Sequence, residues 1–72
     1  MIVIDKHGER YSVFRSLDQQ KRVILVIRKL SPVEPVKQIV IASGFDPELW
    51  HVHGLAEVSF DDVLNYYELT KV

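Results

Sequence analysis

The sequence predicts an α+β domain, in which a small antiparallel sheet of four or five strands in meander order carries one C-terminal helix on a face. Three apolar, β-rich runs at residues 1–14, 21–30 and 36–43 alternate with turn-forming segments. A helix start signal at Ser59 is followed by apolar residues at helical spacing. At 72 residues the chain predicts a single domain, 1–72, with a thin core.

Residues 1–14 predict a β-hairpin that turns at His7-Gly8. Centring the turn there places favourable partners opposite each other, namely Lys6 with Glu9, Asp5 with Arg10, Ile4 with Tyr11 and Ile2 with Val13. A turn of three to five residues stays open, because histidine is a poorer left-handed residue than asparagine.

The next two runs predict a buried strand pair. The run Val23–Ile27 is apolar on both strand faces, which places it at the centre of the sheet. Pro32 and Pro35 interrupt any regular ladder before residues 36–43 resume a β-rich pattern. If the intervening residues form the loop, the facing pairs are Leu25 with Ile41, Val26 with Val40, Ile27 with Ile39 and Lys29 with Lys37.

Residues 44–58 allow two interpretations. Asp46-Pro47 can cap a short helix that stops at Gly54, or it can precede a strand in which Trp50 and Val52 share a face. The strand is favoured, because tryptophan, valine and two histidines are mediocre helix formers in so short a segment.

The C-terminal helix is predicted to begin after Ser59, which caps the first turn. Its core stripe is formed by Phe60, Val63, Leu64 and Tyr67. Residues 69–72 are expected to fray or to add a short edge strand. An alternative fold is a small SH3-like barrel, in which residues 60–66 shorten to one helical turn and residues 67–72 form the closing strand.

The composition excludes several functional classes. Apolar residues make up 47% and charged residues 26% of the chain, as in ordinary globular proteins. The absence of cysteine excludes disulfides, a thiolate nucleophile and sulfur-ligated zinc, and it favours a cytoplasmic location. Asp5 interrupts the first apolar residues far short of a signal-peptide core or the ~20 residues of a membrane span, so no membrane partner is predicted.

The net charge of −1 conceals an asymmetry between the two halves of the chain. Residues 1–37 hold eight bases against four acids, a balance of +4, and residues 38–72 hold one base against six acids, a balance of −5. These charges either pair across the folded surface or create a basic side and an acidic side suited to a charged partner or to head-to-tail assembly.

Catalytic and cofactor chemistry find little basis in the sequence. His51 and His53 are weak metal candidates, since a strand would place both imidazoles on one face, but no second short-spaced ligand pair accompanies them. Asp61 and Asp62 are explained as first-turn acids that favour the helix dipole. No Walker loop or dinucleotide-binding glycine pattern occurs, so we expect no enzyme activity, cofactor or metal.

Nucleic-acid binding is the first alternative function, and its candidate residues are Lys21, Arg22, Arg28, Lys29 and Lys37. Strand geometry separates the pair at residues 21 and 22 from the pair at residues 28 and 29 by about 20 Å, which describes two clusters instead of one patch.

Aromatic residues favour a protein partner. Trp50 and Tyr66 are the predicted protein-binding residues, because exposed aromatics are enriched in interfaces. The sequence thus predicts a small non-catalytic protein-binding module that acts by self-association, as a homo-oligomer, or by docking to a larger protein. A nucleic-acid-associated accessory protein is the alternative, and a histidine-dependent metalloenzyme is the third interpretation. The sequence does not identify the partner.

Overall fold

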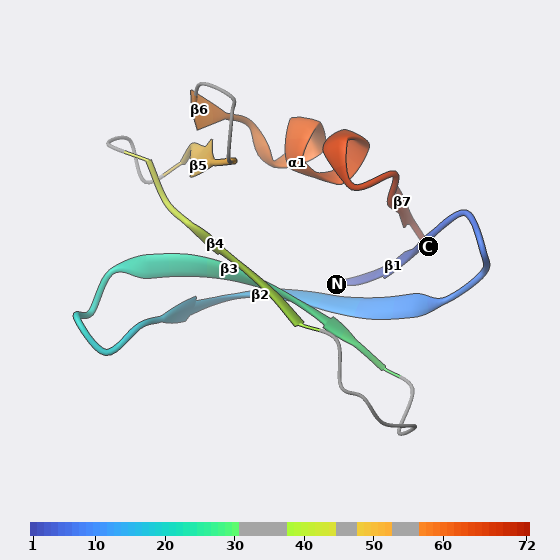
Figure 1. Ribbon diagram of the computed structural model, residues 1–72, viewed down its shortest axis with the longest axis horizontal. Coiled ribbons are helices and arrows are strands. Elements are labelled where there is room, and N and C mark those ends of the chain that lie inside the picture. Colours follow the sequence, from blue (N-terminus) through green and yellow to red (C-terminus); the bar gives the residue numbers. More distant parts are fainter. Residues whose placement is uncertain (31–37, 45–47, 53–56) are drawn as a thin grey trace.

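The computed structural model describes residues 1–30, 38–44, 48–52 and 57–72, and it shows an open five-stranded antiparallel sheet with one C-terminal helix (Figure 1). The strand order is β4-β3-β2-β1-β7. The sheet strands are β1 (Ile2–Ile4), β2 (Arg10–Leu17), β3 (Val23–Lys29), β4 (Gln38–Ala42) and β7 (Thr70–Lys71). The other elements are β5 (Trp50–His51), β6 (Glu57–Val58) and α1 (Phe60–Tyr66).

The predicted α+β fold with its meander sheet and C-terminal helix is confirmed. The barrel alternative is wrong, because β4 and β7 lie at opposite edges of the sheet and do not pair with each other. The predicted edge strand near the C-terminus is present as β7, which pairs with β1. A short pairing of β5 with β6 was not predicted.

The predicted register of the first hairpin is wrong by one residue. Val3 lies opposite Tyr11 and Ile4 opposite Arg10, so the loop contains three residues instead of two, within the range of three to five that the sequence left open. Gly8 occupies the left-handed position of this loop, at φ +82°. The backbone amide of Gly8 donates to the carbonyl of Asp5 at 3.1 Å, as in a type I turn followed by a left-handed residue.

The Asp5 carboxylate explains the change of register. Its Oδ1 accepts hydrogen bonds from the amides of His7 at 2.8 Å and Glu9 at 2.9 Å, and its Oδ2 accepts one from the Tyr11 hydroxyl at 2.9 Å. Local bonds of this kind set the turn in preference to the cross-strand charge pairs. Desolvation by burial raises the pKa of Asp5, but the hydrogen bonds from Glu9, Tyr11 and His7 outweigh it and leave this pKa below its usual value.

The turn between β2 and β3 is held by the same kind of aspartate hydrogen bonds. Asp18 Oδ1 accepts from the amides of Gln20 at 2.8 Å and Arg22 at 2.9 Å. The amide of Lys21 donates to the Asp18 carbonyl at 2.9 Å, as Gly8 does to Asp5. Lys21 therefore stands in the left-handed position, at φ +63°, where a side chain is strained.

We expect Lys21→Gly to raise the free energy of unfolding by about 1 kcal/mol, because glycine adopts this conformation without steric cost. Gly8→Ala is the matched control and should destabilise the domain, although its added Cβ would meet no atom within 4 Å. Urea unfolding measures both variants. A Lys21→Gly variant no more stable than the parent would show that this turn carries no backbone strain.

Strand β3 is interior, as predicted, but it lies second from the β4 edge, and β2 is the central strand. The predicted register between β3 and β4 is confirmed: Leu25 pairs with Ile41, Val26 with Val40 and Ile27 with Ile39. The predicted apposition of Lys29 and Lys37 cannot be compared, since Lys37 lies outside the described residues.

One face of the sheet carries the core. Its buried side chains pack against residues of β5, of α1 and of the segment after the helix, and the buried cluster comprises Val3, Val13, Leu25, Ile27, Ile41, Trp50, Val52, Val63, Leu64 and Leu69. The favoured strand is present in a shorter form as β5, which ends before Val52, and Trp50 and Val52 are both buried. Asp46, Pro47, His53 and Gly54 lie outside the described residues.

The helix begins where the sequence predicts. Ser59 is the N-cap, and its Oγ accepts from the amide of Asp62 at 3.3 Å. Val63 and Leu64 are buried, and Phe60 and Tyr67 pack against the core at its margin, so the predicted stripe faces the sheet.

Candidate protein-binding surface

The opposite face of the sheet is covered by no described helix or strand (Figure 1). Because side chains alternate along each strand, the even-numbered positions of β1 to β4 point to this side. We call it the uncovered face and define it by Ile2, Arg10, Phe14, Ile24, Val26, Arg28 and Val40. It is built from three long strands of the sheet and the adjoining edge of β1, so its backbone is held in place by ladder hydrogen bonds.

An apolar row crosses the middle of the uncovered face. Phe14 lies opposite Val26, and Val26 lies opposite Val40, on three adjacent strands. Phe14 is 38% exposed and Val40 is 53% exposed, whereas Val26 between them is buried. The row therefore offers a partner two accessible side chains, one on each side of a buried valine.

Arg28 lies beside this row. Its guanidinium carbon is 5.7 Å from the Phe14 ring centroid, within the range of a cation–π contact. Its Nε donates to Oε1 of Gln38 at 3.0 Å, which ties the side chain to β4. The positive charge is thus held next to the apolar row and remains exposed.

The uncovered face is cationic as well as apolar. Arg10 and Arg28 are the charged residues at its strand positions, and neither has a carboxylate partner in the described parts of the chain. Five other basic residues are ion-paired, namely Lys6 with Glu68, Arg15 with Glu48, Arg22 with Asp18, Lys29 with Glu9 and Lys71 with Asp61. Part of the charge asymmetry seen in the sequence is therefore paired, and part remains on this face.

Strand β4 forms one edge of the sheet and adjoins the uncovered face. The sequence Gln38–Ala42 contains no charge and no proline, the usual devices that protect an edge from pairing with another chain. A bridge between Ser43 and Trp50 occupies the edge just beyond the strand, so the accessible edge is shorter than a typical strand.

Trp50, one of the two predicted protein-binding residues, belongs to the core. Its side chain is 0% exposed, and Arg15 lies over its ring at 5.5 Å from the centroid. A side chain so enclosed offers no accessible surface in this structure, so the proposed binding surface does not include Trp50. Its Nε1 is buried without a hydrogen-bond partner in the described parts of the structure.

Tyr66, the other predicted protein-binding residue, is 50% exposed on α1. Its ring packs edge-on against Tyr67, with centroids 4.9 Å apart and planes at 85°. This contact orients the Tyr66 ring and leaves half of the residue exposed. The role of Tyr66 in binding stays a prediction.

The four predicted nucleic-acid residues that the structure describes do not lie in one patch. Lys21 lies in the turn between β2 and β3, and Arg22 pairs with Asp18 at 2.9 Å. Arg28 lies on the uncovered face, whereas Lys29 alternates to the other face and lies 3.7 Å from Glu9. Lys37 lies outside the described residues.

The weak metal candidates are His51 and His53. His51 is exposed on β5, and His53 lies outside the described residues. The described residues include no group of three histidine or carboxylate side chains arranged to hold a metal ion. Within them no helix has the length and apolar character needed to cross a membrane.

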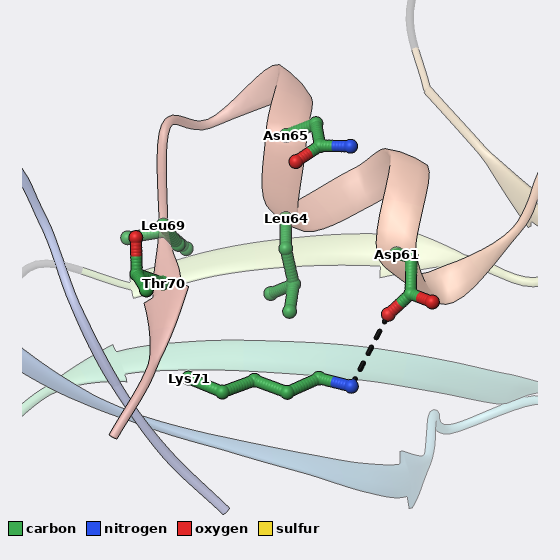
Figure 2. A pocket seen from close by; sticks show the side chains of 6 residues that line it. All are labelled: Asp61, Leu64, Asn65, Leu69, Thr70 and Lys71. Atoms are coloured by element: carbon green, nitrogen blue, oxygen red, sulfur yellow. Dashed lines mark ion pairs between the residues drawn. The ribbon is translucent and has the colours of Figure 1, made fainter.

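A pocket of about 420 Å³ lies between α1 and β7, as Figure 2 shows. Asp61 and Lys71 point toward each other across it, with Oδ1 and Nζ 3.2 Å apart. The rest of its lining is Leu64, Asn65, Leu69 and Thr70. The ion pair occupies both charged groups, so the pocket can accept a small polar or apolar group but presents no unpaired acid or base.

Sequence reasoning missed both the uncovered face and this pocket. Side chains that alternate along the strands could have revealed the apolar row of Phe14 and the even positions of residues 21–30, but the register between β2 and β3 was not predicted.

Comparisons with protein-family models, with curated proteins and with solved structures give no match to this chain.

Proposed function

We propose that this protein is a small non-catalytic protein-binding module whose binding surface is the uncovered face. It acts by self-association or by docking to a larger protein, and the absence of cysteine fits a cytoplasmic setting. The observation that carries this proposal is the row Phe14–Val26–Val40, an accessible apolar surface on a rigid sheet.

Physical chemistry supports a protein partner for such a surface. Burying apolar area contributes roughly 25 cal/mol per Å², and a flat sheet face loses little conformational entropy when it is covered. Aromatic residues and arginine are enriched at interface centres, and Phe14 and Arg28 occupy the middle of this face. Arg10 and Arg28, which have no carboxylate partner among the described residues, supply orientation and selectivity for an acidic surface.

The test is site-specific photocrosslinking in the cells that naturally make the protein. Benzoylphenylalanine in place of Phe14 is expected to give covalent adducts with protein, either a second copy or a larger partner. Leu17 is the matched control position, because it lies on the same strand, is 61% exposed and alternates to the opposite face. Absence of protein adducts from position 14, or equal adducts from both positions, would overturn the proposal.

A nucleic-acid-associated role is the second candidate, favoured by the contact of Arg28 with the exposed Phe14 ring. Aromatic rings and arginines together stack on bases, although platforms of this kind usually carry more than one ring. Photocrosslinking of position 14 to RNA or DNA, with retention on heparin that falls steeply with salt, would favour this function over protein binding.

A further inference from the structure

We propose that the uncovered face is occupied by the outer side of α1 from a second copy of this chain. We define the outer side of α1 by Asp62 and Tyr66, which are both exposed and lie one helical turn apart. This inference rests on the proposed function, because it names the partner of the same surface.

The outer side of α1 carries an acid that the chain leaves unpaired. Asp61 is 3.2 Å from Lys71, and Glu68 is 3.0 Å from Lys6. The carboxylate of Asp62 has no basic partner in the described residues, and its backbone amide is already used by Ser59. Tyr66 adds an aromatic ring that is half exposed.

The two surfaces match in charge and in residue type. On the uncovered face a cation and an apolar ring lie in contact, at Arg28 and Phe14, with 5.7 Å between the guanidinium carbon and the ring centroid. On α1 an acid and an aromatic residue stand one helical turn apart, at positions i and i+4. Asp62 of one copy can therefore face Arg28 of the next while Tyr66 packs against Phe14 and Val40.

Geometry forbids this contact within one molecule, because α1 and the uncovered face lie on opposite sides of the sheet (Figure 1). A contact between two different surfaces leaves one uncovered face and one outer side of α1 free at the ends of the assembly, so further copies can add until a ring closes or a longer chain forms.

Packing two uncovered faces against each other is the competing arrangement. It would bring Arg10 and Arg28 of both copies together without an acid among the described strand positions of either face, which is electrostatically unfavourable.

The test is a charge swap between Arg28 and Asp62, followed by sedimentation of the full chain. The parent should associate as its concentration rises, and less so at high salt. Arg28→Glu and Asp62→Lys should each weaken association about tenfold, because each opposes like charges. An equimolar mixture of the two variants should recover it, since each contact in the mixture again joins opposite charges. The double variant should behave like the mixture.

Recovery on mixing also excludes misfolding as the cause of the loss, because an unfolded variant cannot restore its partner. Arg28→Gln provides a milder version of the same change should the reversal unfold the chain. Lys21→Glu is the matched control: this exposed lysine lies in the turn between β2 and β3, and its reversal should leave association unchanged.

Three results would overturn the inference: a parent that stays monomeric at high micromolar concentration in low salt, single variants that associate like the parent, or a mixture that stays dissociated. A monomeric parent that still yields adducts with another protein from position 14 would retain the proposed function and reject only the second copy as its partner. A parent that stays monomeric and also gives no protein adducts from position 14 would reject both the proposed function and the second copy as partner.

Discussion

Replacing Trp50 with alanine is expected to lower the free energy of unfolding by about 3 to 5 kcal/mol. The indole is completely buried in the core, and its removal would leave a cavity that the short β5 strand cannot fill. A domain of this size has a total stability of only several kcal/mol, so a large fraction of the variant should be unfolded at 25 °C.

The variant Trp50→Phe separates the contribution of aromatic packing to stability from that of the indole N–H group. This variant keeps an aromatic ring and removes a buried donor that has no partner in the described residues, so it should lose much less stability than Trp50→Ala. Circular dichroism during urea unfolding measures both. Fluorescence of the parent gives an independent check, because Trp50 is its one tryptophan and should emit as a buried indole. A Trp50→Ala variant as stable as the parent would place this residue outside the core.

Leu25→Ala is expected to cost about 2 to 5 kcal/mol, because Leu25 is buried on β3 between β2 and β4. Leu17→Ala is the matched control, since the same atoms are removed from a side chain that is 61% exposed. Its cost should be below 1 kcal/mol. Equal losses in the two variants, measured in urea, would contradict the assignment of β3 as an interior strand.

The sequence predicts those parts of the fold that side-chain polarity determines. The run Val23–Ile27 predicts an interior strand, and its register with β4 follows because the two apolar runs face each other there. Ser59 and the stripe after it predict the helix start and its buried side, because capping and periodicity are local properties.

The hairpin over residues 1–14 was predicted, but its favoured register was wrong because a side chain competes with the strand pairs. Charge pairing favours a two-residue turn at His7-Gly8, whereas the Asp5 carboxylate bonds two amides of its own loop and adds a residue to it. The same device at Asp18 sets the register of β2 against β3. This register aligns Phe14 with Val26, so the apolar row could not be identified without it.

Trp50 and Tyr66 show why exposure is harder to predict than secondary structure. Both are aromatic residues in short segments, but one is buried at the centre of the core and the other is half exposed. What separates them is the chain reversal that folds β5 back over the sheet, which no local pattern specifies. The uncovered face has a similar origin, because a helix of seven residues covers only one side of a five-stranded sheet.

We propose that copies of this protein meet through the uncovered face, and residue-resolved NMR of the parent on dilution measures this association residue by residue. A series from about 1 mM to about 10 μM spans the dissociation constants of weak complexes. We expect concentration-dependent amide shifts at Phe14, Val26 and Val40, and at Asp62 and Tyr66, with little change in the turn around Lys21. Spectra that do not change on dilution, or shifts confined to other surfaces, would contradict the account.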